Sequence, residues 1–364
     1  LNTMFNVSSI PKDTQLRDVL DQCPSDKLEK IYADFSYHLQ RSKYLQAYQF
    51  IEGMYLMPVD GSQYFSSQKI NCPSCLTKTS TKGVIRYSHQ ILQAVIVHPD
   101  NKQVIPLAPE AIQNTDGTEK QDCEINAGKR FIKKFRKTHP KLKIIYGGDD
   151  LFSNQPFIDE LKAANMSFIL VAKPSSHKIL HEWFTDIKRM GEACRLEFTD
   201  FKKRHHIYEW VNEIPLNGTK DADDVNFFYY RLVEKGEITY RNSWVTDIVI
   251  DENNVIQLVK GGRARWKVEN EGFNTLKNQG YHIEHNFGHG QHNLSMNFFL
   301  LNVLAFFVHQ IFELTDLHYQ TCRAKFSARK EFWNQLRCTI RILLFKTWED
   351  LLAFIICPPQ ARAP

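Results

Sequence analysis

Apolar residues recur at intervals of three to four along residues 14–50, which predicts helices at the start of the chain. The pattern then changes to an apolar run at residues 54–59, which ends at the turn signal Asp60-Gly61. We expect a strand there that stops at the acid. Two more strands are expected in the following β-branched and aromatic runs, at residues 84–97 and 104–107.

A strand–helix–strand pattern occupies the middle of the chain. Residues 121–138 are expected to form a basic amphipathic helix, and the short apolar run at 142–146 reads as a buried strand that leads to Asp149. A helix near residues 156–164 and a strand at 168–172 come next. This order implies a pair of parallel strands joined by a right-handed crossover.

Short β-like runs replace this pattern between residues 192 and 250, and helical patterning returns at 253–278 and 292–314. The predicted fold class is therefore α/β, a mixed sheet flanked by helices, with a mostly β insertion and a helical C-terminal region. The expected units are an N-terminal helical segment (1–50), the core's first part (51–190), the β-rich insertion (191–250), the core's second part (251–314) and the C-terminal helical region (315–364).

Composition narrows the class of protein. The chain has 364 residues, of which 43% are hydrophobic, enough for a sizeable core. Its net charge of +5 is a mild excess, compatible with nucleic acid as a partner. Eight cysteines without a recognisable signal peptide suggest reduced thiols and a cytoplasmic protein. The apolar run at residues 298–312 is interrupted by polar residues, so we expect a buried helix there and no membrane span.

Acidic residues stand where a site could form. Asp60 and Asp149 end predicted strands, and if these are parallel neighbours, both carboxylates project from one edge of the sheet. Glu269 lies on the helix after the β insertion. Magnesium prefers such oxygen ligands, and a pair of divalent ions can catalyse phosphodiester chemistry. Asp150 and Glu271 are the local alternatives to the second and third acids.

The segments around these acids resemble the motifs of a known family, the DDE transposases of bacterial insertion sequences. Residues 59–62 (VDGS) are similar to the first-aspartate motif, and residues 148–154 (GDDLFSN) to the second. Residues 265–270 (RWKVEN) resemble the third, an Arg-Trp-x-Ile-Glu signature on a helix. The resemblance covers roughly residues 50–310. It departs from the signature at Gly262, where the family has a tyrosine, and at Leu276, where it has a basic residue.

The resemblance implies an RNase H-like core in which Asp60, Asp149 and Glu269 hold two Mg²⁺ or Mn²⁺ ions. The implied activity is hydrolysis and strand transfer at the ends of an insertion sequence. The implied partners are double-stranded DNA at the element ends, target DNA and a second copy of the chain in a synaptic homodimer, in a bacterial cytoplasm at the nucleoid. The alternatives are an RNase H-like nuclease without strand transfer, or a catalytically decayed zinc-containing DNA-binding protein.

Basic side chains are candidates for contacts with DNA phosphate. Arg265 lies one turn before Glu269 on the same helix face, and Lys277 follows two turns after it. Trp266 could stack on a flipped base, although we expect it in the core. A basic cluster on the helix at 121–138 could also bind phosphates or form a solvated face, and comprises Lys129, Lys133, Lys134, Arg136 and Lys137.

Cysteine and histidine residues suggest a second kind of metal site. Cys72 and Cys75 have the spacing of a zinc knuckle, which needs two more ligands, or they form a reduced structural pair. Candidates for those ligands are His89, His98 and Cys123. The segment at 281–292 holds four further histidines, which could bind a metal or phosphate, or could stitch a polar loop together by hydrogen bonds.

Overall fold

The computed structural model describes residue 4 and residues 7–113 and 121–358. The chain begins with two helices, α1 (Asp13–Gln22) and α2 (Asp26–Arg41), followed by 3₁₀ turns at Tyr44–Tyr48 and Ile51–Gly53. These elements confirm the helical pattern expected over residues 14–50. The Tyr32 hydroxyl on α2 donates a hydrogen bond to the Leu300 carbonyl, which fastens this segment to the later part of the chain.

A mixed sheet forms the centre of the fold, and its strands run in the order β2-β3-β1-β6-β7-β11-β10-β9-β8, with β4 and β5 paired to β3. β1, β6 and β7 are parallel to one another, and the other pairings are antiparallel. The strands are β1 (Tyr55–Ser67), β2 (Leu76–Thr79), β3 (Ile85–Ile96), β4 (Ile105–Pro106), β5 (Glu110–Ile112), β6 (Ile144–Gly148), β7 (Ser167–Val171), β8 (Cys194–Thr199), β9 (His205–Pro215), β10 (Asp224–Glu234) and β11 (Glu237–Thr246). The α/β class with a mixed sheet flanked by helices is thus confirmed.

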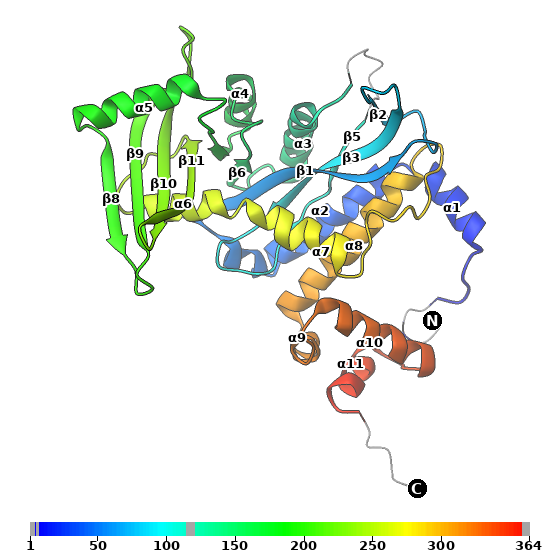
Figure 1. The fold of residues 1–364 in the computed structure, drawn as a ribbon. Coiled ribbons are helices and arrows are strands. Elements are labelled where there is room, and N and C mark those ends of the chain that lie inside the picture. Colours follow the sequence, from blue (N-terminus) through cyan, green and yellow to red (C-terminus); the bar gives the residue numbers. More distant parts are fainter. Residues whose placement is uncertain (1–3, 5–6, 114–120, 359–364) are drawn as a thin grey trace.

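The strands expected in a β-rich insertion extend this sheet. Trp244 of β11 pairs with Val171 of β7, so the antiparallel strands β11 to β8 continue from the parallel ones (Figure 1). The helix α5 (Lys178–Met190) lies across these strands and was not expected from the sequence. Its side chains Leu180 and Phe184 are buried, and Phe184 packs on Phe227 of β10, so α5 covers an apolar face of these strands.

Helices cover both faces of the sheet (Figure 1). On one side lie α3 (Glu124–Thr138), α4 (Gln155–Ala163) and α5. The other side carries α6 (Val255–Arg263), a π-helix (Val268–Phe273), α7 (Asn274–Asn278) and α8 (Leu294–Thr315). The main hydrophobic core fills the space between these layers. The remaining helices, α9 (Leu317–Ala324), α10 (Arg329–Ile342) and α11 (Trp348–Ile356), enclose a second, smaller core.

Helix α8 confirms the helical pattern expected at residues 292–314. By length and composition alone it could cross a membrane, which is weak evidence for a single helix. One of its faces packs into the main core through Leu300, Val303 and Phe306. Its polar residues also have partners inside the protein, since the Asn297 amide donates to the carbonyls of Leu20 and Cys23. These contacts fasten one face of α8 to the rest of the protein, as expected for a helix that packs against the core.

Two local expectations about the elements are wrong. β1 does not stop at Asp60, because its pairing with β3 continues to Ser67 and is interrupted only by a bulge near Gln63. The long helix expected at residues 253–278 is broken after Arg263 and resumes as the π-helix. The second difference matters for function, because the π-helix carries Glu269.

Candidate active site

Strand register brings the first two acids together. Pro58 of β1 pairs with Gly147 of β6 in parallel, so Asp60 and Asp149, each two residues further on, reach the same edge of the sheet. Burial raises the pKa of Asp60, the nearby charge of Arg265 lowers it, and the charges of Asp149 and Glu269 raise it again, with a net rise. Asp149 and Glu269 therefore both lie within electrostatic reach of Asp60, although the three acids come from three separate segments.

Glu269 is presented by the π-helix, which contacts β1 and β3. π-helical turns are rare and are found frequently at functional sites. One turn earlier, the Arg265 Nη1 atom lies 3.5 Å from Asp60 Oδ2, which ties this segment to the end of the parallel strands. Trp266 is 47% exposed under the Arg265 guanidinium, so the expectation of a core tryptophan is wrong.

A fourth acid, Glu124, was not identified from the sequence. It lies in the first turn of α3, and burial together with the charges of Asp149 and Asp60 raises its pKa. A Cβ atom on Gly61 would lie 2.3 Å from Glu124 Oε1, so the glycine after Asp60 leaves the space that this carboxylate occupies. Acids are common in the first turn of helices because of the helix dipole, so the sequence pattern alone did not distinguish Glu124.

A buried tyrosine lies beside these acids. Tyr146 of β6 is fully buried, and the charges of Asp149 and Glu124 add to the burial that raises the pKa of its phenol. Its hydroxyl has no hydrogen-bond partner in the described ranges 7–113 and 121–358. An unpaired buried hydroxyl is costly, so this phenol, within reach of the charges of Asp149 and Glu124, is available as a hydrogen-bond donor.

The two adjacent aspartates have different surroundings. Asp150 Oδ1 accepts hydrogen bonds from the Lys173 backbone N at 2.8 Å and from the Ser176 hydroxyl at 2.6 Å. Asp150 therefore fastens the loop that follows β7. Asp149 instead interacts with Asp60 and Glu124, and its Oδ1 atom accepts a hydrogen bond from the Leu151 backbone N. This arrangement favours Asp149 over Asp150 as the second member of the acidic cluster.

Arg136, which the sequence suggested as a DNA contact, is engaged by the protein itself. Its guanidinium donates hydrogen bonds to the carbonyls of Leu142, Ala164 and Asn165 at 2.7–2.9 Å. These bonds join α3 to the loops around β6 and α4. Because its donors are used in this way, Arg136 is not retained as a candidate for phosphate binding.

Other members of the basic cluster on α3 form ion pairs. Lys134 Nζ lies 2.8 Å from the carboxylate of Glu110, and Lys129 Nζ lies 3.9 Å from that of Glu160. Outside α3, Lys277 pairs with Glu284 at 2.9 Å. Within the described part of the chain, the predicted phosphate contacts on α3 that stay exposed without an ion pair are Lys133 and Lys137.

An open cleft of about 800 Å³ lies between α5 and the strands β9 to β11, and five Lys or Arg side chains are among the residues that line it. Lys173 and Arg241 are exposed there and form no ion pair within the described chain, whereas Lys188 and Arg231 pair with the buried Glu209. Lys173 lies two residues after the end of β7, at the edge of the sheet that also carries Asp60 and Asp149. Sequence reasoning missed this cleft because its residues are scattered over four elements.

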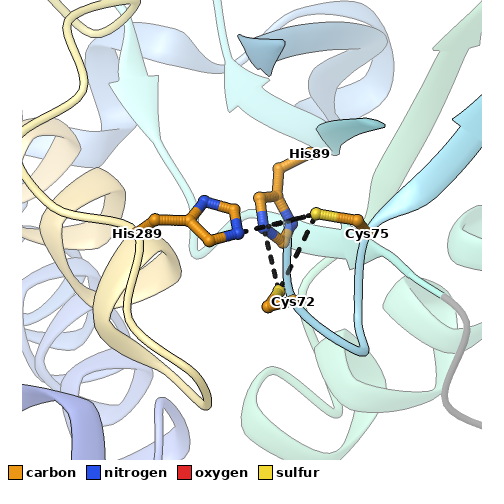
Figure 2. Close-up of side chains that lie close together, drawn as sticks. All are labelled: Cys72, Cys75, His89 and His289. Atoms are coloured by element: carbon orange, nitrogen blue, oxygen red, sulfur yellow. Dashed lines mark hydrogen bonds between the residues drawn. The ribbon is translucent and has the colours of Figure 1, made fainter. Parts of the chain in front are cut away.

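Two cysteines and two histidines form a cluster away from the acids (Figure 2). Their donor atoms, two sulfurs and two ring nitrogens, all lie within 4.8 Å of one another, so the group could hold a metal ion. Cys72 and Cys75 precede β2, His89 lies in β3, and His289 lies in the loop between α7 and α8. Burial, aided by the charge of His289, lowers the pKa of His89 to about 4, which leaves its imidazole neutral near pH 7.

The structure brings together only part of the suggested ligand set. His89 joins the two cysteines as expected, but Cys123 is exposed at the start of α3 and His98 accepts a hydrogen bond from the Asp100 backbone N instead. The fourth member, His289, comes from the histidine-rich segment at 281–292, for which a separate metal or phosphate site was expected. A pairing between positions 214 residues apart could not be inferred from local spacing.

The two clusters differ in the ions they suit. Among the described residues, the Cys–His group is the one whose ligand atoms lie close enough together for a single metal ion, whereas the acids Asp60, Asp149, Glu124 and Glu269 interact through their charges. The sulfur and nitrogen donors of the second cluster suit softer ions such as zinc.

No family model and no curated protein matches the chain.

Proposed function

We propose that this protein is a DDE-type DNA transposase with an RNase H-like catalytic core. Asp60, Asp149 and Glu269 would hold two Mg²⁺ or Mn²⁺ ions, and Glu124 would complete the ligand sphere. The convergence of Asp149 and Glu269 on Asp60 carries the proposal, because the charges of both raise the pKa of Asp60 and because the register of β1 and β6 brings Asp60 and Asp149 to one edge of the sheet. The motif resemblance around the same three residues supports it independently.

The chemistry would be divided between the ions and the protein. When bound, the two ions activate water or a DNA 3′-hydroxyl and stabilise the leaving oxygen. The carboxylates would orient the ions, and Arg265, which balances the charge at Asp60, would contact an incoming phosphate. The Tyr146 hydroxyl can donate to a carboxylate of the cluster and so fix its orientation.

The proposed substrate is double-stranded DNA, at element ends and at a target. The open cleft beside α5 supports this, because its cations Lys173 and Arg241, which form no ion pair in the described chain, could bind DNA phosphates at the same edge of the sheet as the acids. Trp266, exposed beside Arg265, offers a flat face for an unstacked base. A synaptic homodimer would bring two such sites to paired ends. The free cysteines agree with a reducing bacterial cytoplasm, where the protein would meet DNA at the nucleoid.

The test is metal-dependent nicking of labelled DNA that carries the terminal sequences flanking the gene. We expect wild-type protein to nick the ends only with Mg²⁺ or Mn²⁺, and Asp149→Asn and Glu269→Gln to lose activity on the order of 10³-fold, by analogy with removal of other transition-state stabilisers. Each variant has a close control. Asp150→Asn keeps the Oδ1 acceptor that holds the 173–176 loop, and Glu271→Gln lies two residues from Glu269.

The controls also define what would overturn the proposal. If the two controls lose activity while Asp149→Asn and Glu269→Gln keep it, the proposed ligands are wrong. If folded wild-type protein binds DNA but never cleaves it, the protein is a decayed DNA-binding relative of a transposase. Products joined to a target plasmid distinguish transposition from the action of an RNase H-like nuclease, which would release cut ends without joining them.

A further inference from the structure

The spacing of the cysteine–histidine cluster matches a filled tetrahedral site. With Zn–S bonds of about 2.3 Å and Zn–N bonds of about 2.05 Å, tetrahedral geometry places two sulfurs about 3.8 Å apart, and a sulfur and a nitrogen about 3.6 Å apart. The Sγ atoms of Cys72 and Cys75 are 3.8 Å apart. His89 Nε2 lies 3.4 Å from Cys72 Sγ and 3.5 Å from Cys75 Sγ, and His289 Nε2 lies 3.6 Å from Cys75 Sγ.

The surroundings of the cluster favour a bound ion. The four side chains point toward a common centre (Figure 2). Phe65 packs on His289 with ring centroids 4.4 Å apart, and Tyr64 stacks on His89 at 5.8 Å, so aromatic rings of β1 shield the group from water. The sulfur–sulfur distance is far longer than the roughly 2.05 Å of a disulfide, so both thiols are available as ligands.

We propose that Cys72, Cys75, His89 and His289 bind one zinc ion as a closed structural site, which clamps the α7–α8 loop to the hairpin of β2 and β3. All four positions of the tetrahedron come from the chain, which is the pattern of structural zinc and leaves no position for a substrate. The proposal does not depend on transposase activity, because it concerns different residues and a different metal.

The clamp would join distant parts of the fold. Cys72 and Cys75 lie between β1 and β2 and His89 lies in β3, whereas His289 belongs to the connection that follows the π-helix and α7. The backbone of this loop is shaped to present His289, since Gly288 and Gly290 on either side have φ angles of +155° and +67°. A Cβ on Gly290 would lie 2.4 Å from Asp21 Oδ1, so a side chain there would displace the loop.

The opposite side of the loop is already fastened by α1. The Asp21 carboxylate accepts hydrogen bonds from the backbone N atoms of Gln291, His292 and Leu294, at 3.0–3.1 Å. With zinc on one side and Asp21 on the other, the loop would be fixed between α1 and the hairpin. Zinc would therefore maintain the position of the helical segment that carries Glu269 relative to β1.

The first measurement is the zinc content of the full-length protein, purified without a histidine tag. We expect about one zinc per chain, the stoichiometry of a single four-ligand site. The content should fall to background in Cys75→Ser and stay at the wild-type level in Cys123→Ser, which alters an exposed cysteine outside the cluster. Wild-type protein that neither contains zinc nor takes it up after reduction would overturn the proposal.

Further measurements keep the test valid if Cys75→Ser does not fold. Wild-type protein loaded with Co²⁺ should show thiolate charge-transfer and tetrahedral d–d absorption bands, and their absence would contradict the site. His289→Ala leaves three ligands, so it should release zinc to a chelator faster than wild type, while His285→Ala in the same loop should not. Equal release rates for His289→Ala and wild type would exclude His289 from the site.

The clamp itself is tested by limited digestion with chymotrypsin. Phe287 lies in the loop, and Phe201, 90% exposed in the turn between β8 and β9, provides an internal control. Removing zinc from wild-type protein should speed cleavage at Phe287 and leave cleavage at Phe201 unchanged. If cleavage at Phe287 is the same with and without zinc, the ion does not clamp the loop. None of these readouts uses DNA cleavage, so they can fail or succeed independently of the proposed catalytic function.

Discussion

At the scale of single residues, the acidic cluster opposes folding of the metal-free protein. Asp60 has a raised pKa, mainly because burial disfavours its ionised form. Below the unfolded-state pKa of about 3.9 the residue is protonated in both states and has no effect. As the pH rises through the folded-state pKa, the unfavourable charge develops fully and the free energy of unfolding falls.

Asp60→Asn should therefore raise the melting temperature of the metal-free protein at pH 7, and this gain should disappear as the pH falls below about 4. Mg²⁺ should raise the melting temperature of the wild type but not of the variant, because the ligand is gone. Thermal melts across pH, with and without Mg²⁺, measure both effects. Glu252→Gln, an exposed acid, is the control and should melt like the wild type. A lower melting temperature for Asp60→Asn throughout would contradict this account.

Glu124 and Gly61 form a pair that can be tested by a double-mutant cycle. Glu124→Gln should reduce metal-dependent nicking by about 10–100-fold, the usual effect of altering a supporting group at a metal site. Gly61→Ala should reduce it in the same range, because the new methyl group would occupy the place of the Glu124 carboxylate. Since both changes act through one carboxylate, the double variant should be little worse than either single variant. Fully additive losses would show that Gly61 acts independently of Glu124.

At the scale of elements, the periodicity of apolar residues predicted the strands and helices that pack into the core. It did not predict features that depend on pairing with another segment or on the backbone hydrogen-bond pattern. The parallel pair β1 and β6, and hence the meeting of Asp60 and Asp149, followed from two apolar runs that each lead to an acid. The extension of β1 beyond Asp60 did not, because its continuation depends on pairing with β3 and includes exposed residues. The π-helix was equally hidden, since its hydrogen-bond pattern has no distinct residue signature.

Packing explains why Gly262 stands where the transposase signature has a tyrosine. A Cβ at this position of α6 would lie 2.6 Å from the indole of Trp244 in β11, so no side chain fits. Gly262→Ala should lower the free energy of unfolding by about 1–3 kcal/mol, the range for overpacked cores. Urea denaturation measures the change, and Gln257→Ala on the exposed side of the same helix should have little effect. A neutral or stabilising Gly262→Ala would mean that the indole moves aside at little cost.

At the scale of the whole molecule, a modest excess of positive charge conceals an uneven distribution. Acids concentrate at the edge formed by β1 and β6, while free cations lie in the cleft beside α5. Much of the basic helix α3, which stands out in the sequence, is engaged in ion pairs or backbone contacts. The sequence could indicate that cations are present, but which of them remain available depends on acids from distant segments such as Glu110 and Glu209.

This distribution predicts which surface binds DNA. Each phosphate contact that is lost should reduce the slope of log affinity against log salt by about 1, so Lys173→Gln with Arg241→Gln should reduce it by about 2. The matched pair Lys133→Gln with Lys137→Gln removes the same charge from α3. If α3 is a solvated face, that second pair leaves the slope unchanged, and a titration of fluorescent duplex DNA at several salt concentrations distinguishes the two. The opposite result would place the DNA across α3, and the cleft beside α5 would then serve the protein's own packing.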